Sequence, residues 1–310
     1  MFNFIALAVL VLIISLLYDR YIQKYNQNTE LEAYDRIKHY LLNDSSISKK
    51  SIIWIHLPYR YNARKWSSFY SRSSHNLNQP YQFLTIESII KKNQDCHICL
   101  IDDDSFNNLI PNWTLQLDTI AEPSRDRVRL LAQLKLLYYY GGVFVPSSFL
   151  CLRPLSKLVQ NEKPFIIENL NHTLHPDEYL PDYRFMGAKR ECETINAFIH
   201  YMEVLCSEDF TDAATILGKI QDWCRCRIND GTVDLVDGSL IGIKTVQNKP
   251  ILLDNLFEES PLDINRQAYG LYIPQDDLLK RNQFNWFCAL EPGEIPTITA
   301  VLGRYFMMAG

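Results

Sequence analysis

Residues 124–155 constrain the fold most, because they combine a helix pattern, a tight stop and a short apolar run. One apolar face recurs at the spacing of successive helical turns, through Leu130, Leu131, Leu134, Leu137 and Tyr138. Ser124 stands where an N-cap would, and Gly141 and Gly142 stand where a C-cap and a tight turn would. Residues 143–145 then predict a short buried strand. Ligands bind beyond the carboxyl ends of strands in open α/β sheets, so we expect a ligand site after this strand.

Two further apolar runs predict strands before the central helix, and the first of them, residues 52–56, suits a buried parallel strand. Residues 52–56 end in His56, which is either a ligand contact at the strand's carboxyl edge or a hydrogen-bonded core histidine. Residues 98–101 are followed by three adjacent carboxylates, Asp102, Asp103 and Asp104. These carboxylates either approach a ligand or a divalent ion, or form a solvated turn that caps a short helix over residues 105–109.

The rest of the chain predicts a succession of helices and strands. We expect helices over residues 78–90, 194–206 and 212–226, and strands within 112–122 and over 164–168, 184–188 and 239–243. The aromatic tail, residues 269–305, is short of charge and should pack on the domain. The pattern predicts one α/β domain with a mostly parallel sheet over residues 51–310.

The central stretch resembles the DxD-type capsular-polysaccharide and mannosyltransferase-like glycosyltransferases. The approach to the strand, residues 137–144, and the exit from it, residues 152–155, match that family's pattern, and the similarity extends over roughly residues 52–190. The resemblance implies a GT-A-like nucleotide-sugar-transferase fold. The two aspartates of the motif, however, are replaced here by Pro146 and Ser148. This Val-Pro-Ser-Ser-Phe variant also resembles divergent members in large DNA viruses, which suggests a viral membrane or capsid assembly.

The resemblance also assigns candidate site residues. As sugar-nucleotide contacts it implies His56, Asp102, Asp103, Asp104, Arg129, Gly141 and Gly142. Asp126 and Arg129, at the start of the central helix, are its catalytic candidates, and their alternative is a surface ion pair that contributes little. Neither proline nor a neutral serine replaces a carboxylate as a ligand for Mg²⁺ or Mn²⁺, so we expect no metal and no cofactor, with a nucleotide sugar as the candidate ligand.

The leading hypothesis for function is therefore a catalytically inactive, glycosyltransferase-like scaffold or interaction protein. The alternative is an active, metal-independent glycosyltransferase in which Arg125, Arg129 and Arg153 replace the metal. A third hypothesis is a lectin-like module that binds a sugar nucleotide without turnover. Asp237 and Asp254 remain open as acceptor bases.

The N-terminus predicts a membrane anchor. Residues 2–18 are apolar apart from Asn3 and Ser15, so we expect a transmembrane segment in residues 1–25 and a stalk with a lead-in helix over 26–50. A cleaved signal peptide and a buried core helix are the rival interpretations. Arg20 and Lys24 follow the segment and no basic residue precedes it, which favours a cytosolic body.

The amino-acid composition limits which classes of binding partner are expected. Lysine and arginine number 31 against 36 aspartates and glutamates, a net charge of −5, so nothing favours nucleic acid. The eight cysteines are scattered, as in reduced compartments, and Cys96 and Cys99 are not expected to bind zinc. One loop is rich in arginine and aromatic residues: Tyr59, Arg60, Tyr61, Arg64 and Trp66. Such a composition is typical either of a surface that binds a protein partner or of a site that binds a phosphate and a ring.

Overall fold

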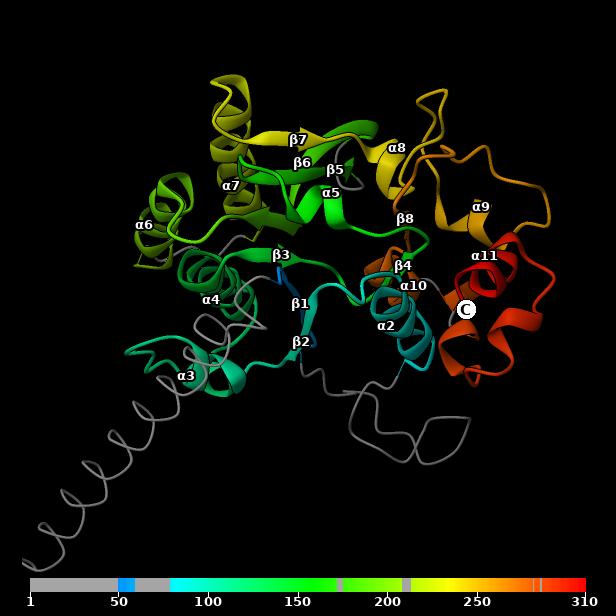
Figure 1. Cartoon of the computed structure of the whole chain (residues 1–310), viewed down its shortest axis with the longest axis horizontal. Coiled ribbons are helices and arrows are strands. Elements are labelled where there is room, and N and C mark those ends of the chain that lie inside the picture. Colours follow the sequence, from blue (N-terminus) through cyan, green and yellow to red (C-terminus); the bar gives the residue numbers. More distant parts are fainter. Residues whose placement is uncertain (1–49, 59–78, 172–174, 208–212, 281, 285) are drawn as a thin grey trace, which may run out of the picture.

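The computed structural model describes residues 50–58, 79–171, 175–207, 213–280, 282–284 and 286–310, and it shows a mixed α/β protein (Figure 1). The predicted anchor, the stalk and the loop from Tyr59 to Trp66 lie outside these residues. Within the part of the chain that is described, no helix combines the length and the apolar character needed to cross a bilayer.

The central sheet has six strands in the order β2-β1-β3-β6-β5-β7. Pairs β2–β1, β1–β3 and β5–β7 are parallel, while β6 runs antiparallel to both of its neighbours, so the sheet is mostly parallel as predicted. The strands of this sheet are β1 (Ile52–His56), β2 (His97–Ile101), β3 (Gly142–Phe144), β5 (Phe165–Asn171), β6 (His175–Ala188) and β7 (Asp234–Val236). A second, two-stranded sheet pairs β4 (Phe149–Cys151) with β8 (Gly270–Tyr272).

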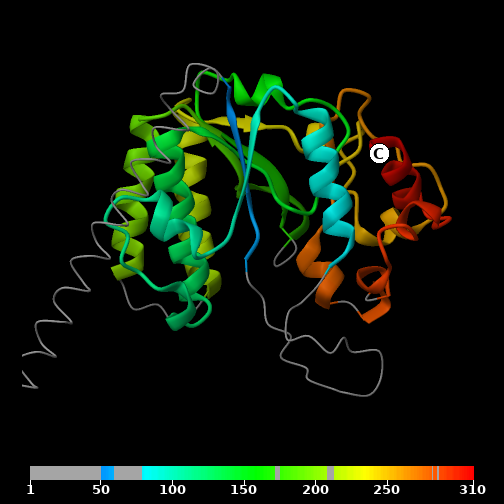
Figure 2. The same cartoon turned by 60° about the horizontal axis from the view of Figure 1, so that its bottom comes forward.

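Helices cover both faces of the central sheet (Figure 2). The α-helices are α2 (Tyr81–Lys92), α3 (Ser105–Leu109), α4 (Ser124–Tyr140), α5 (Ser156–Val159), α6 (Glu193–Ser207), α7 (Ala213–Asn229), α8 (Gly238–Ile241), α9 (Leu253–Phe257), α10 (Gln275–Lys280) and α11 (Val301–Ala309). Short 3₁₀ turns are η1 (Leu117–Thr119), η2 (Asn282–Phe284), η3 (Phe287–Ala289) and η4 (Ile295–Thr297). Helices α4, α6 and α7 lie on one face, and α2 lies on the other with the C-terminal elements.

Strand β1 explains why the sheet has two hydrophobic cores. Successive side chains of a strand point to opposite faces, and β1 is apolar at every position but its last. Ile52 and Trp54 pack into the core beneath α4, α6 and α7, whereas Ile53 and Ile55 pack into the core on the α2 side. All four are at most 4% exposed, so β1 is the buried strand that its sequence predicts.

The Gly141-Gly142 turn joins α4 to β3 at the amino end of that strand. Both glycines have positive φ, at 71° and 106°. A Cβ on Gly142 would lie 2.4 Å from the carbonyl oxygen of Ile52, closer than any side chain tolerates. Backbone approach between neighbouring strands therefore requires glycine at this position. Helix α4 itself begins at Ser124, with Pro123 rather than Ser124 as its N-cap.

Two of the predicted strands are wrong. Residues 239–241 belong to the short helix α8, because the Asp237 carboxylate accepts a hydrogen bond from the Ser239 N–H, and Gly242 ends the helix in the left-handed conformation. Residues 112–122 contain the 3₁₀ turn η1 and no strand. The strand predicted over 184–188 is the last third of the much longer β6.

The C-terminal part forms a third core, as the aromatic tail predicts. It packs around Phe284, Phe287 and Phe306, and it includes Leu150 and Leu271 from the small sheet β4–β8. This packing attaches β8 and α10 to the body of the domain, beside the carboxyl end of β3.

Candidate functional site

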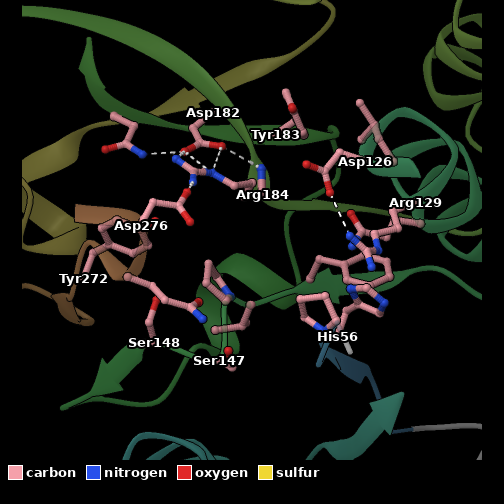
Figure 3. A pocket seen from close by; sticks show the side chains of 18 of the residues that line it. His56, Asp126, Arg129, Ser147, Ser148, Asp182, Tyr183, Arg184, Tyr272 and Asp276 are labelled. Atoms are coloured by element: carbon pink, nitrogen blue, oxygen red, sulfur yellow. Dashed lines mark hydrogen bonds and ion pairs between the residues drawn. The ribbon is translucent and has the colours of Figure 1, made fainter. Parts of the chain in front are cut away.

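A cavity of about 450 Å³ opens at the carboxyl ends of β1 and β3 (Figure 3). The chain leaves β1 for β2 on one side, and β3 then adds on the other side of β1, so this is a topological switch point of the sheet. The cavity volume falls within the range of small-molecule sites. It is bounded by α4 on one wall, by β6, β8 and α10 on the opposite wall, and by the segment after β3 between them.

The segment after β3 forms the floor of the cavity between the two walls. Pro146, Ser147 and Ser148 all line the cavity, and the two serines are 5% and 2% exposed. The turn is firmly held: the Thr85 hydroxyl donates to the Ser147 carbonyl at 2.5 Å, and the Ile273 N–H donates to the Ser148 carbonyl at 3.1 Å. The predicted position at the cavity is therefore correct, and it presents no carboxylate.

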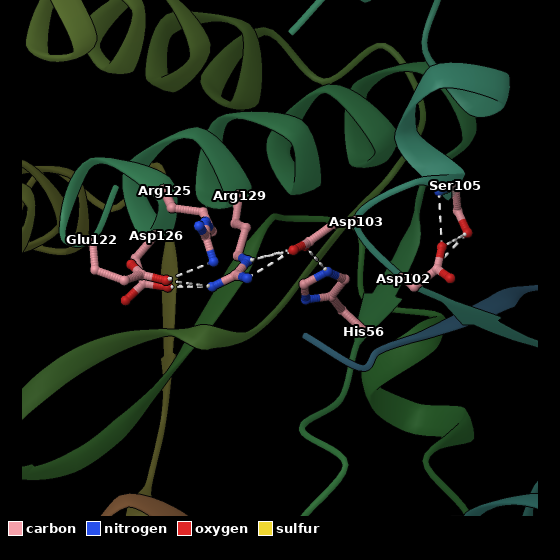
Figure 4. Close-up of polar contacts among 8 residues, drawn as sticks. All are labelled: His56, Asp102, Asp103, Ser105, Glu122, Arg125, Asp126 and Arg129. Atoms are coloured by element: carbon pink, nitrogen blue, oxygen red, sulfur yellow. Dashed lines mark hydrogen bonds and ion pairs between the residues drawn. The ribbon is translucent and has the colours of Figure 1, made fainter. Parts of the chain in front are cut away.

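Arg129 lies at the centre of a group of charged and polar side chains on the α4 side of the cavity (Figure 4). We call this group the Arg129 wall, and it consists of His56, Asp103, Glu122, Asp126 and Arg129. Its guanidinium binds Asp103 through Nε and Nη2, the shortest contact being 2.7 Å, and its Nη1 donates to Asp126 at 2.8 Å and to Glu122 at 3.1 Å. The His56 Nε2 lies 2.9 Å from the Asp103 carboxylate. The Arg129 side chain is only 7% exposed. Three carboxylates thus occupy four of its five N–H groups.

The Arg129 wall is electrostatically locked. Burial opposes ionisation of Asp103, but hydrogen bonds from His56 and Arg129 outweigh it and lower the pKa of this carboxyl to about 2. Burial likewise works against the Arg129 charge, yet its bonds to Asp103 and Asp126 raise the pKa of the guanidinium further above its ordinary value. Both groups therefore remain charged, and the pair stays formed, at all physiological pH values.

The opposite wall, which we call the Arg184 wall, consists of Asn169, Asp182, Arg184, Tyr272 and Asp276. Arg184 binds Asp182 through Nε at 2.9 Å and Nη2 at 2.7 Å, and its Nη1 lies 3.3 Å from Asp276. Asn169 also donates to Asp182, which is 7% exposed. The Arg184 side chain, in contrast, is 47% exposed and faces the open cavity.

A bulge in β6 places this arginine. Ile166 of β5 pairs with Met186, but the next residue, Ile167, pairs with Asp182, so residues 183–185 are extra residues in β6. Asp182 stabilises the bulge by accepting the backbone N–H of Arg184 at 2.8 Å. Such bulges redirect side chains beside functional sites.

Ionisation on the Arg184 wall follows the same rule. Burial opposes the Asp182 charge, but Arg184 and Asn169 hold the pKa of this carboxyl below its usual range. Burial raises the pKa of Tyr272 to about 12, so its ring enters the cavity as a neutral phenol.

The structure brings together some of the predicted site residues and leaves others apart. His56, Asp126 and Arg129 line the cavity, and Asp103 lies directly behind Arg129. Asp102 is exposed and accepts from the N–H and the hydroxyl of Ser105, as the turn-and-cap alternative predicts.

Asp104 is also exposed, as the N-cap residue of α3. Gly141 and Gly142 lie at the opposite end of β3 from the cavity, where they serve the backbone turn.

The three arginines of the metal-independent hypothesis do not converge. The Arg125 Nε donates to the Ile120 carbonyl at 2.8 Å, outside the cavity. Arg153 is exposed beyond β4 and does not line the cavity either. Asp237 is the N-cap of α8 and pairs with Lys244 at 3.0 Å, and Asp254 lies in the first turn of α9. Neither aspartate lines the cavity.

Among the described residues, no group of three or more histidine, cysteine, aspartate or glutamate side chains is arranged to hold a metal ion. Burial raises the pKa of Cys99 to about 11, and burial together with Asp95 also raises that of Cys96. Metal-binding cysteines need the opposite shift, because the ligand is the thiolate.

Sequence reasoning missed the Arg184 wall as a site. The sequence predicts Arg184 only as part of a strand, and it gives no sign that Asp182, Tyr272 or Asp276 belongs to a site. One signal was available: Asp182 and Arg184 are an i, i+2 pair of opposite charge, which places both on one face of a strand.

Comparison with known proteins adds no assignment: no protein-family model matches the chain, and no curated protein matches it.

Proposed function

We propose that this chain is a glycosyltransferase-like protein of the GT-A kind that has lost metal-dependent transfer and works as a membrane-anchored, non-catalytic binding scaffold. The observation that carries the proposal is the segment 146–148, which enters the switch-point cavity where the motif's carboxylates would stand and offers a proline and two buried serines. The mostly parallel sheet and the position of the cavity fit the same proposal.

The electrostatics of glycosyl transfer explain why this segment matters. A departing nucleoside diphosphate carries negative charge, and an enzyme must stabilise that charge with a metal ion or with unoccupied cationic groups. Arg129 is buried against three carboxylates, so it has no charge to spare for a phosphate. Arg184 is paired with Asp182 and Asp276.

The metal-independent transferase is the weaker candidate for the same reason. It needs Arg125, Arg129 and Arg153 near one point, and only Arg129 lines the cavity. No observation on the described residues favours it over the scaffold.

The scaffold's proposed protein partner would bind through the loop of Tyr59, Arg60, Tyr61, Arg64 and Trp66. Its composition supports this, because tyrosine, tryptophan and arginine dominate the energetics of protein interfaces. Replacing Tyr61 and Trp66 by alanine should abolish co-purification of a partner, while Phe83→Ala, at an exposed position on α2, should leave it intact.

The proposal is tested by sugar-nucleotide turnover in the full chain, purified in a polyoxyethylene detergent. Release of UDP or GDP from common sugar nucleotides would be measured with and without Mn²⁺ and with a panel of acceptors. We expect no release above the protein-free blank. Mn²⁺-dependent release that disappears in Arg184→Gln would overturn the proposal, whereas release unchanged by this variant would identify a contaminating enzyme.

A further inference from the structure

The cavity carries hydrogen-bonding capacity that its own side chains do not use. Gln133 of α4, Gln221 of α7 and Gln275 of α10 line it from three directions and are partly exposed. Their amides have no hydrogen-bond partner among the residues that the structure describes. Each amide offers two donors and an acceptor, so the three together present both kinds of group to one small volume.

Arg184 adds directed donors. Its pairing with Asp182 and Asp276 uses three of the five guanidinium N–H groups, through Nε, one Nη2 N–H and one Nη1 N–H. Two N–H groups remain on a side chain that is 47% exposed and lies in the cavity. Because Asp182 holds the guanidinium by a two-pronged contact, these donors have a fixed direction before a ligand arrives.

The charge of the lining argues against a phosphate. Among the residues that the structure describes, four carboxylates line the cavity, Asp126, Asp182, Asp276 and Asp277, against the two guanidinium groups of Arg129 and Arg184. Counting carboxylate and guanidinium groups alone, the described part of the lining has a formal excess of two negative charges. A nucleoside diphosphate would add further negative charge to a site whose cations are already paired, which is unfavourable. An uncharged ligand avoids this repulsion.

Apolar surface completes the lining. Leu217 lines the cavity and is 38% exposed, and Leu130, Leu180 and Tyr272 line it with smaller exposed fractions of 2%, 7% and 9%. These surfaces suit the C–H faces of a ring whose edges carry hydroxyl groups, since each hydroxyl both donates and accepts a hydrogen bond.

We infer that the Arg184 wall and the three glutamines form a binding site for a neutral, polyhydroxylated ring, a pyranoside without phosphate, and that the cavity excludes nucleoside diphosphates. This inference rests on the proposed function in taking the cavity to be non-catalytic, and it names the ligand that the cavity holds. The same chemistry occurs in a free monosaccharide and in the terminal residue of an oligosaccharide.

The test is direct titration of the full chain, in a detergent without a sugar headgroup, because a maltoside would compete. Isothermal titration would use methyl glycosides of glucose, galactose, mannose and N-acetylglucosamine, their linear disaccharides and trisaccharides, and UDP and GDP with and without Mn²⁺. We expect one or more neutral sugars to bind and neither nucleotide to do so. A disaccharide that binds at least about tenfold more tightly than its monosaccharide indicates a glycan as the source, and equal affinities indicate a free sugar.

Two variants connect binding to the wall. Arg184→Gln should weaken sugar affinity at least about tenfold, because it removes fixed, charge-assisted donors. Arg190→Gln is the matched control: that side chain is also 47% exposed and ion-paired, but it does not line the cavity, and affinity should stay within about twofold. Gln221→Leu, which leaves the Arg184 pairs intact, should weaken binding on its own and covers the case of a poorly folded Arg184 variant.

The outcomes separate this inference from the proposed function. Absence of binding by every neutral sugar, binding of UDP or GDP instead, or sugar binding unaffected by both Arg184→Gln and Gln221→Leu would each overturn the inference and leave the scaffold proposal standing. Metal-dependent turnover of a sugar nucleotide would overturn the proposed function, whatever the titrations show.

Discussion

In both the Arg129 wall and the Arg184 wall an arginine is paired with carboxylates, but the two arginines differ in how far they are exposed to the cavity. Arg129 is 7% exposed and is bound by three carboxylates, whereas Arg184 is 47% exposed and keeps two N–H groups directed into open space. Removing one partner of a buried ion pair destabilises the fold strongly, and a guanidinium held by three carboxylates has little capacity left for a ligand. An arginine that is anchored on one edge and open on the other is already oriented for a ligand. The contrast therefore assigns a structural role to the Arg129 wall and a binding role to the Arg184 wall.

The largest expected effect tests the structural role of Arg129. Arg129→Met should lower the free energy of unfolding by about 3 kcal/mol, because Asp103, only 14% exposed, would lose its main counter-charge. Urea denaturation measures the change. Arg125→Met, on the same helix but with its nearest carboxylate at 3.9 Å, should cost less than about 1 kcal/mol. Equal losses in the two variants would remove the distinction between a buried and a peripheral arginine.

The second prediction is that the contribution of Asp103 to stability is lost at low pH. The pKa of Asp103 is about 2 in the folded protein, below its ordinary value of 3.8, so its contribution to stability is complete above about pH 4 and is lost as pH falls through 2. The contribution amounts to about 2 kcal/mol. The stability of the native protein minus that of Asp103→Asn, measured by urea denaturation from pH 5 to 2, should decline over this window. A difference independent of pH would show that the Asp103–Arg129 pair contributes nothing through ionisation.

A smaller loss of stability is expected when Arg184 of the Arg184 wall is replaced. Arg184→Gln should lower the free energy of unfolding by about 1 kcal/mol, because the glutamine amide can still donate to Asp182, which also keeps its bonds from Asn169 and from the backbone N–H of residue 184. The same urea experiment measures it, with Arg190→Gln as the control. A loss as large as that of Arg129→Met would mean that both walls are mainly structural.

The smallest effect is a difference in salt sensitivity. Raising the ionic strength from about 0.1 to about 1 M shortens the screening length from about 10 to about 3 Å, which affects exposed pairs most. The stability cost of Arg184→Gln should therefore shrink by a few tenths of a kcal/mol, while that of Arg129→Met should stay constant. Paired urea titrations at the two salt concentrations measure both changes. Identical responses would contradict the difference in exposure.

Local pattern in the sequence was sufficient for the centre of the fold. The apolar run at residues 52–56 became β1, because burial on both faces leaves a continuous apolar signal. The run ending at Ile101 became the edge strand β2, in which Leu100 is 49% exposed, and the helix predicted before Gly141 became α4. The position of Pro146 and Ser148 at a ligand cavity was also predictable, since parallel strands deliver the residues that follow them to one edge. The strand predicted over residues 239–243 was wrong, because a run this short has no periodicity that distinguishes a strand from a helix. The N-cap at Asp237 favours the helix that the structure shows.

The sequence by itself determined the buried strands, the helix that feeds β3 and the absence of carboxylates at positions 146 and 148. Only the tertiary structure decided that Arg129 is locked and Arg184 is open. The β6 bulge exists through pairing with β5, and Tyr272 reaches the cavity because β8 pairs with β4, more than 100 residues earlier in the chain. Periodicity reports the local burial of a segment, whereas these contacts join distant segments and leave no local trace, so the binding wall emerges only when the chain is folded.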